Sequence, residues 1–314
     1  MNNFFIGIDL GGTRVKLGLI NDDTLIDKKI IPAQSATGLA SSLPAIKYHI
    51  NDLLDSNNIN RENLKGIGFG FPGLVDSKSN KILSTNAKYV DALNIELKGW
   101  IKENWNVDFF MDNDARLAAV GEWKYGAGKD TNDLVAITIG TGIGTSVIME
   151  GKLLRGKHFQ AGCLGGHISA VYNGRMCNCG NQGCVETYAS TWSLKERIEA
   201  HKNFQTSALS KVHVIDFETL FTEADNNDAL AIEFKKDCID LWSAAIVNLI
   251  HAYDPEVVVI GGGVMNRHGE IIPLIKERVY KHAWTPWGKV DIRPSTLLAD
   301  AGLFGAVYCL KNKL

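Results

Sequence analysis

The sequence contains little proline, no long apolar run and no excess of charge of one sign. Only 7 of its 314 residues are proline, against 31 glycines, and 45% are apolar. This composition is typical of a folded α/β protein and argues against a disordered or collagen-like chain. The 33 basic and 35 acidic residues are mixed along the chain, so the concentrated cationic face that nucleic-acid phosphates require is not expected.

Segments that would direct the chain to a membrane are also missing from the sequence. The most apolar stretch, residues 241–253, contains Ser243, Asn248 and His251 and is shorter than the roughly 18 residues that span a bilayer. The first residues, MNNFFIGIDLGG, lack the basic segment of a secretory signal. We therefore expect a cytoplasmic protein with no membrane partner, whose six cysteines are reduced thiols or metal ligands rather than disulfides.

The length and the alternation of strand-like and helix-like segments indicate an α/β protein of two domains. Apolar runs predict strands at 4–9, 15–19, 24–31, 65–71, 107–111, 134–139, 145–149, 256–260 and 289–292. Helical spacing predicts helices at 39–54, 96–105, 115–125, 229–253, 271–282 and 301–310. We place a smaller N-terminal α/β domain at 1–114 and a larger α/β domain at 115–299, and we expect a final helix, about 300–314, to pack back on the first domain.

Two glycine turns between strands are similar, which suggests two halves of one architecture. IDLGGT from Ile8 matches ITIGTG from Ile137, so Asp9 corresponds to Thr138 and only the first half carries a carboxylate. A third glycine turn, 261–263, follows a later strand. Glycine lets backbone N–H groups approach an anion closely, so together the turns predict a nucleotide cradle, although each alone is also explained as a structural turn. None matches the Walker sequence or the dinucleotide fingerprint.

Two acidic positions stand at strand ends. Asp9 is a candidate partner for Mg²⁺, acting through water, and its alternative role is to cap the turn. The tripeptide Asp112-Asn113-Asp114 precedes a predicted helix, which needs an N-cap of this residue type. Three such residues exceed what capping needs, and a carboxylate at a strand end can act as general base toward a hydroxyl.

A cysteine-rich segment gives the sharpest local pattern. Three thiols follow a histidine within a short glycine-containing loop: His167, Cys177, Cys179 and Cys184. Three thiolates and one imidazole form a closed tetrahedral set that suits structural zinc, and the alternative is a group of buried free thiols. The remaining cysteines, Cys163, Cys238 and Cys309, are expected to be ordinary buried residues. A zinc site would hold the adjacent Glu186 rigidly.

These motifs together resemble the ROK group of sugar kinases and sugar-responsive repressors. The resemblance runs along the whole chain and is carried by IGIDLGGT from Ile6, FPG from Phe71, NDA from Asn113, GTGIG from Gly140 and the CxCGxxGCxE signature from Cys177 to Glu186. It implies an actin-like, hexokinase-type (ribonuclease H-like) two-domain fold with a nucleotide and sugar cleft between the domains. The implied activity is glucokinase-like transfer of phosphate from ATP to a hexose or N-acyl hexosamine hydroxyl, most often at C6.

The resemblance also implies roles for individual residues. Asp114 is the catalytic base. The implied sugar contacts are Gly73, Asn113, Asp114, His167 and Glu186. The implied nucleotide contacts are Asp9, Gly11, Gly12, Thr13, Gly140, Thr141, Gly142, Gly262 and Gly263. The zinc ligands fall on His167, Cys177, Cys179 and Cys184. ATP, Mg²⁺ and structural Zn²⁺ are the implied cofactors, and a homodimer built through the larger domain is the implied assembly.

One position departs from the family pattern. Leu164 stands where the family usually has a glutamate that contacts the sugar. Three explanations remain open: a sugar with a different substituent, such as an N-acyl amino sugar; a neighbouring residue that supplies the contact; or weakened catalysis in a sensor. Retention of Asp114 argues against the last.

Two other functions compete with the kinase. A non-enzymatic sugar-responsive repressor of the same family would carry an N-terminal helix-turn-helix, but the first strand begins at Phe4 and leaves no room for one. A polymerising or chaperone-type actin-like ATPase shares the nucleotide turns but does not account for the cysteine-rich loop.

Overall fold

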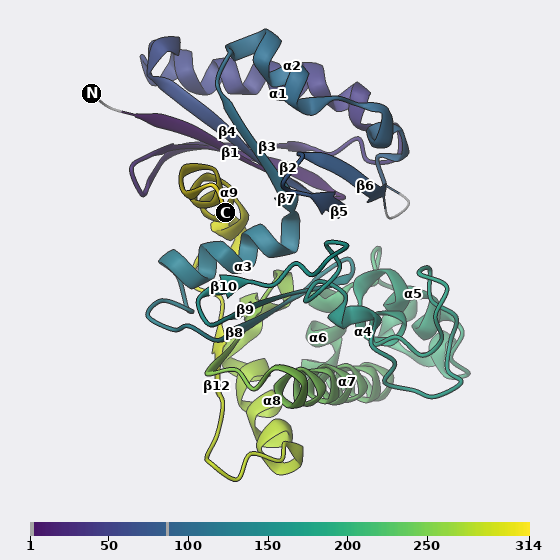
Figure 1. Ribbon diagram of the computed structural model, residues 1–314. Helices are drawn as coiled ribbons and strands as arrows, with labels where there is room; N and C mark the ends of the chain where they lie inside the picture. Colours follow the sequence, from purple (N-terminus) through teal and green to yellow (C-terminus); the bar gives the residue numbers. More distant parts are fainter. Residues whose placement is uncertain (1–2, 86–87) are drawn as a thin grey trace. The chain divides into compact units, whose positions relative to one another are not determined.

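The computed structural model describes residues 3–85 and 88–314, which form two compact units (Figure 1). Unit 1 comprises Met1–Asp130, Leu153–Ala161 and Ala299–Leu314, and unit 2 comprises Thr131–Lys152 and Gly162–Leu298. The boundary was expected after Asp114, whereas unit 1 continues through Asp130 and takes back a short segment from the middle of the chain. The difference has a physical cause, because the helix after Asp114 packs along the C-terminal helix rather than within unit 2.

Unit 1 is a sheet with helices on both faces. Its strands, in the order β3-β2-β1-β4-β7, are β3 (Thr24–Pro32), β2 (Arg14–Asn21), β1 (Phe4–Leu10), β4 (Leu64–Phe71) and β7 (Asp108–Asn113). β2 pairs antiparallel with both β3 and β1, while β4 and β7 run parallel to β1. One face is covered by α1 (Leu39–Ser56) and α2 (Leu97–Trp105), and the other by α3 (Asp114–Tyr125) and α9 (Ala301–Asn312). A separate ribbon pairs β5 (Gly73–Asp76) with β6 (Lys81–Thr85).

Unit 2 repeats the same strand order. Its strands, in the order β10-β9-β8-β11-β12, are β10 (Lys152–Leu153), β9 (Ile143–Met149), β8 (Leu134–Ile139), β11 (Val257–Gly261) and β12 (Asp291–Pro294). In each sheet the first two strands form an antiparallel hairpin, and two later strands, β4 and β7 in unit 1 and β11 and β12 in unit 2, add in parallel. The helices of unit 2 are α4 (Glu186–Ala189), α5 (Thr191–Glu199), α6 (Phe217–Asp225), α7 (Ala229–Tyr253) and α8 (His268–His282). The two-halves architecture expected from the paired glycine turns is therefore present.

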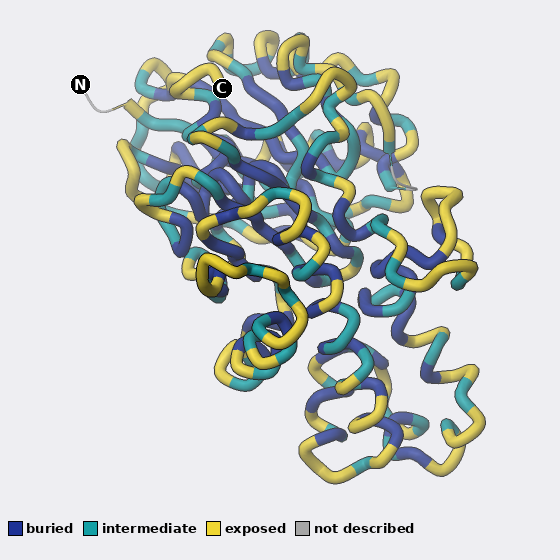
Figure 2. The backbone as a smooth tube through the Cα atoms, turned by 60° about the horizontal axis from the view of Figure 1, so that its bottom comes forward, coloured by how far each residue is buried: buried dark blue, intermediate teal, exposed yellow. Residues whose placement is uncertain are grey.

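Short 3-10 turns connect several of these elements. They are η1 (Arg61–Asn63), η2 (Val90–Asn94), η3 (Gly165–His167), η4 (Phe204–Thr206), η5 (Ala208–Ser210), η6 (Gly263–Arg267) and η7 (Leu298–Asp300). The central strands are buried along most of their length, whereas the connections are largely exposed (Figure 2). Within residues 3–85 and 88–314, every helix is too short or too polar to cross a membrane.

Candidate functional site

The first glycine turn, in unit 1, is held by its carbonyl groups. The hydroxyl of Tyr89 donates to the Gly11 carbonyl at 2.9 Å, and the hydroxyl of Ser35 donates to the Gly12 carbonyl at 2.7 Å. The Thr13 carbonyl accepts the Ala33 N–H at 2.9 Å. The Gly11 N–H donates to the Arg14 carbonyl at 3.0 Å. The N–H groups of Gly12 and Thr13 are therefore the ones that an anion could approach.

Asp9 lies beside this turn and carries its own counter-charge. It stands opposite Lys16 in the β1–β2 pairing, and Lys16 Nζ lies 2.8 Å from Asp9 Oδ2. The symmetry of the hairpin about its turn could have identified this pair from the sequence. The Lys88 side chain also reaches the turn, since a Cβ placed at Gly12 would lie 2.7 Å from Lys88 Nζ. No sequence pattern marks Lys88, because it lies in an irregular connection.

The structure separates the roles of Asn113 and Asp114 at the start of α3. Asn113 is the N-cap, because its side-chain oxygen accepts the Arg116 N–H at 3.1 Å. Its amide group donates to the Gly73 carbonyl at 3.0 Å and to Asp114 Oδ1 at 3.1 Å. Capping is thus performed by Asn113, and the Asp114 carboxylate is oriented by Asn113 and by the Ala115 N–H, which donates to it at 2.8 Å.

The environment of Asp114 makes it a weaker acid. Burial, and then the negative charge of Asp9, raise the pKa of Asp114 to about 7, against the opposing effects of the Ala115 N–H, Lys88 and Lys16. A carboxylate whose pKa lies near neutral pH is well matched to accepting a proton from a hydroxyl. The same surroundings act on Tyr89, because burial and Asp9 raise its pKa to about 12.

In unit 2, Glu186 is tied directly to the second glycine turn. Its Oε2 accepts the Ile143 N–H at 2.7 Å, and its Oε1 accepts the indole N–H of Trp192 at 3.2 Å. A Cβ placed at Gly142 would lie 2.6 Å from Glu186 Oε2, so glycine is needed for this approach. The structure thus brings together Glu186 and the predicted nucleotide residues of this turn, while Trp192, which also contacts the glutamate, was not found from the sequence.

The third glycine turn packs against the end of β8. Gly262 has φ +96°, and a Cβ there would lie 2.0 Å from the Ile139 carbonyl oxygen, so the backbone itself requires glycine. Gly140 and Gly263 differ, because among the described residues no atom lies within 4 Å of a Cβ built on either. Space therefore surrounds the α-carbon at both positions, although the Gly140 backbone is itself bonded, with its N–H donating to the Gly142 carbonyl and its carbonyl accepting the Thr191 N–H, both at 3.0 Å.

The four predicted metal ligands converge in unit 2. The ligand atoms of His167, Cys177, Cys179 and Cys184 all lie within 4.8 Å of one another. Cys179 Sγ and Cys184 Sγ are 3.7 Å apart, and Cys177 Sγ lies 3.5 Å from His167 Nδ1. A tetrahedral zinc ion with ordinary bond lengths would set these separations at about 3.8 Å and about 3.5 Å. The donor set and its spacing therefore fit zinc, with Nδ1 as the histidine ligand.

Two of the thiols, Cys177 and Cys184, have raised pKa values, which a bound cation would oppose. Burial, together with hydrogen bonds from the other cysteines, raises the pKa of Cys184 to about 12, and burial also raises the pKa of Cys177. The loop that carries them is anchored to β9, since a Cβ at Gly166 would lie 2.2 Å from the Ile143 carbonyl oxygen. The Leu164 side chain, in contrast, is exposed.

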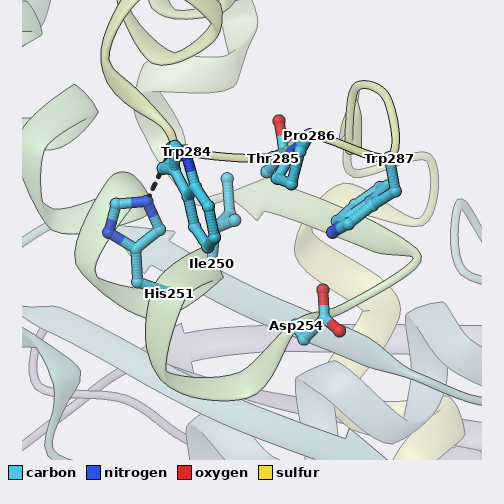
Figure 3. A pocket seen from close by; sticks show the side chains of 7 residues that line it. All are labelled: Ile250, His251, Asp254, Trp284, Thr285, Pro286 and Trp287. Atoms are coloured by element: carbon cyan, nitrogen blue, oxygen red, sulfur yellow. Dashed lines mark hydrogen bonds between the residues drawn. The ribbon is translucent and has the colours of Figure 1, made fainter.

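An aromatic pocket lies elsewhere on unit 2 (Figure 3). It has a volume of about 410 Å³ and is lined by Ile250, His251, Asp254, Trp284, Thr285, Pro286 and Trp287. The Trp284 N–H donates to His251 Nε2 at 2.8 Å. None of the predicted site residues contributes to this pocket, and the sequence analysis did not identify it.

Comparison with known proteins places these features in a family context. The ROK family model matches residues 5–313. A glucokinase of Thermotoga maritima is 32% identical over 98% of both chains. The crystal structure of a ROK family glucokinase from Streptomyces griseus, in complex with glucose and AMPPNP, aligns with a TM-score of 0.78 at 26% identity and covers 99% of this chain and all of that one. A xylose repressor of Bacillus subtilis is 29% identical over 77% of this chain and 60% of its own length.

Proposed function

This chain belongs to the ROK family, and from that membership we propose that it is an ATP-dependent kinase that phosphorylates a sugar hydroxyl. The observation that carries the proposal is the placement of Asp114, a carboxylate with pKa about 7 at the start of α3, oriented by Asn113. The glucokinases that resemble the chain over nearly its full length support the same activity.

In this proposal Asp114 accepts the proton of the attacking hydroxyl. The hydroxyl oxygen forms a bond to the γ-phosphorus of ATP, the bond to the β-phosphate oxygen breaks, and ADP leaves. Asn113 keeps the carboxylate in place through its hydrogen bonds to Gly73 and Asp114. His167 and Glu186 are the sugar contacts that unit 2 would supply, and His167 Nε2 is free to face the sugar because Nδ1 faces the thiols.

The nucleotide is assigned to the glycine turns. In unit 1 these are Gly11, Gly12 and Thr13, whose carbonyls are already engaged. In unit 2 the phosphate-side residues would be Gly140, Thr141 and Gly142, and the adenosine-side residues Gly262 and Gly263. When bound, Mg²⁺ would neutralise phosphate charge, and Asp9 is the carboxylate that would hold it through water. Lys16 and Lys88 add positive charge beside the same turn.

The zinc assigned to His167, Cys177, Cys179 and Cys184 would be structural. Four protein ligands fill a tetrahedral shell and leave no position for an activated water. Its proposed function is to fix the loop that presents His167. It would also hold Glu186, two residues after Cys184, against the second glycine turn.

The repressor alternative rests on the similarity to the xylose repressor, of which 60% is matched. Asp114, with its raised pKa and complete orienting network, favours the kinase because a sensor needs no proton acceptor. The acceptor sugar is proposed to be a hexose or an N-acyl hexosamine, phosphorylated at C6. Leu164, exposed and apolar, makes the N-acyl amino sugars an essential part of any substrate search.

The test is ATP turnover with Mg²⁺ across glucose, mannose, fructose, allose, N-acetylglucosamine and N-acetylmannosamine. We expect one of these to stimulate ADP release strongly, and Asp114→Asn to reduce that rate by roughly 10²–10⁴-fold. Asp108→Asn is the matched control, since it makes the same change at the exposed start of β7. If no sugar stimulates turnover while ATP and sugar still bind, the kinase proposal fails and the sensor alternative gains support.

A further inference from the structure

A buried charge network surrounds Asp112, two residues before Asp114, entirely within unit 1. The Asp112 side chain is fully buried and is flanked by two arginines. Its Oδ1 lies 3.4 Å from Arg116 Nη1, and its Oδ2 lies 2.9 Å from Arg155 Nη2 and 3.0 Å from Arg155 Nε. Arg116 is completely buried, and the side chain of Arg155 is 17% exposed.

The network also fixes the backbone on both sides of it. Asp112 Oδ1 accepts the Asn113 N–H at 2.8 Å, so the carboxylate holds the residue that caps α3 and orients Asp114. Arg116 Nη2 donates to the carbonyls of Phe159 and Ala161 at 2.7 and 3.0 Å. The same charges therefore connect the junction of β7 and α3 to the loop 155–161.

That loop is a closed and conformationally restricted segment. The Ala161 N–H donates back to the Arg155 carbonyl at 3.1 Å. Gly156 and Phe159 both have positive φ, at +68° and +57°, and a Cβ at Gly156 would come within 2.9 Å of the Ala161 side chain. From Ala161 the chain runs on without interruption through Leu164 to His167.

Burial of this network costs more desolvation free energy than a purely structural contact needs to. It places two guanidinium groups and one carboxylate in the interior, and Arg116 is further bonded to two backbone carbonyls. An apolar cluster of similar volume generally holds packed segments together at lower desolvation cost. A charged network with directional hydrogen bonds, in contrast, fixes orientation, which is what a proton acceptor requires.

We propose that Arg155 is a positioning residue for phosphoryl transfer, acting through Asp112 to hold the 112–116 junction and linking it to the loop 155–161. This inference rests on the proposed kinase function for its kinetic consequences. Its structural consequence, a rigid 112–116 junction that depends on Arg155, can be measured whatever the protein's activity.

The test compares Arg155→Met, Arg155→Lys and Arg155→Ala with the wild-type chain. Arg155→Met leaves Asp112 paired with Arg116, one charge of each sign, so the variant is expected to fold. Arg278→Met is the control, because Arg278 is also a partly buried arginine, 23% exposed, paired with Asp240 and donating to a backbone carbonyl. It lies on α8, which belongs to unit 2.

We expect Arg155→Met to lower kcat by about tenfold to 10²-fold with a much smaller change in the KM for sugar. Arg155→Lys should recover part of the loss, and added guanidinium ion at millimolar concentration should partly restore kcat in Arg155→Ala. Amide hydrogen exchange at 112–116 should accelerate at least about tenfold in Arg155→Met and not in Arg278→Met. None of these responses is expected of an arginine that only adds stability.

Two results would overturn the proposal. One is a loss of kcat in Arg155→Met no larger than in Arg278→Met, and the other is unchanged exchange at 112–116. If the wild-type chain phosphorylates no sugar, the kinase function fails by that result, and hydrogen exchange alone decides whether Arg155 holds the junction.

Discussion

Asp9 and Asp114 show how two carboxylates of one unit acquire different properties from their surroundings. Asp9 has the Lys16 ammonium group 2.8 Å away and stands beside the first glycine turn. Asp114 is oriented by an amide side chain and a backbone N–H, and its pKa is raised to about 7 by burial and by Asp9 itself. In the proposed function Asp114 is therefore the proton acceptor, whereas Asp9 would hold Mg²⁺ through water.

The pH dependence of catalysis should report the pKa of Asp114. Because the ionised form accepts the proton, kcat/KM should fall as the pH drops through about 7. Lys88 favours the ionised form of Asp114. Lys88→Met should therefore move the acid limb of the pH profile of kcat/KM to higher pH by up to about one pH unit. Lys65→Met, which removes an exposed lysine bonded to the Glu62 carbonyl, is the control and should leave the limb in place. An acid limb that stays near pH 4 would contradict the assignment.

The same raised pKa predicts a gain in stability when Asp114 is neutralised. A carboxyl whose folded-state pKa lies above its unfolded value of about 4 penalises the folded state most at pH above 7, and the penalty disappears as the pH falls toward 4. Asp114→Asn should therefore raise the free energy of unfolding at pH 8 by roughly 1–4 kcal/mol and by much less at pH 4.5. Denaturant unfolding at both pH values measures this. Asp108→Asn should show no such pH-dependent gain.

At the scale of elements, α3 and α9 form the close contact that keeps α3 in unit 1. Their backbones touch, because a Cβ at Gly305 would lie 1.7 Å from the Leu117 carbonyl oxygen, and one at Gly121 would lie 2.0 Å from the Ala301 carbonyl oxygen. Since Asp114 begins α3, this contact also sets where the carboxylate is presented.

Substitution of Gly305 should separate these helices. Gly305→Ala forces a clash with backbone that no side-chain rotation relieves, so we expect a loss of about 3 kcal/mol in the free energy of unfolding. Gly99→Ala is the matched control in α2, where the nearest atom to a new Cβ is 4.0 Å away. It should gain about 0.5–1 kcal/mol, because alanine favours the helix. Equal effects of the two substitutions on the free energy of unfolding, measured by chemical denaturation, would show that α3 and α9 are not in close backbone contact.

The cysteine loop should depend on its metal. Cys184→Ser removes one ligand, so zinc measured by elemental analysis should fall well below one per chain and the unfolding temperature should drop. The KM for sugar should rise, because Glu186 follows Cys184 closely and bonds to the second glycine turn. Cys163→Ser exchanges a thiol outside the cluster and should leave the zinc content unchanged. Full zinc retention in Cys184→Ser would contradict the assigned ligand set.

The sequence predicted those elements whose pattern is strong. The apolar runs identified both hairpins, and the spacing of apolar residues identified α7 with the bounds the structure shows. The ribbon of β5 and β6 was not predicted, because strands of four and five residues are too short to give a clear pattern. The helices α5 and α6 were also missed, since residues 190–225 mix polar and apolar positions without a long periodic run.

The site residues, too, were predicted only where the sequence has a clear pattern. Asp114, Glu186 and the metal cluster were identified because each lies in a recognisable motif. Lys88 and Arg155 were not, because a single basic residue in an irregular segment has no local signature. Their importance arises from contacts with residues far away in the chain, Gly12 and Asp112, and these appear only when the fold is known.

For the whole molecule, two exposed tryptophans on unit 2 suggest how the expected homodimer is held. The Trp284 and Trp287 residues are 79% and 58% exposed and flank the pocket above Asp254 (Figure 3). Large aromatic side chains left in water around a concave apolar surface are typical of protein interfaces, where tryptophan contributes much of the binding energy. We expect a second copy of the chain to cover this surface.

Sedimentation across a range of protein concentrations tests this expectation. The wild-type chain should sediment at twice its mass of 34.4 kDa, and the double variant Trp284→Ala/Trp287→Ala should raise the dimer dissociation constant at least about 10²-fold. Tyr172→Ala is the control, because Tyr172 is 91% exposed on the same unit but outside the pocket. A monomeric wild type would rule out the dimer itself. A double variant that dimerises normally would place the interface on another surface, because removing both indoles eliminates the apolar area on which this one depends.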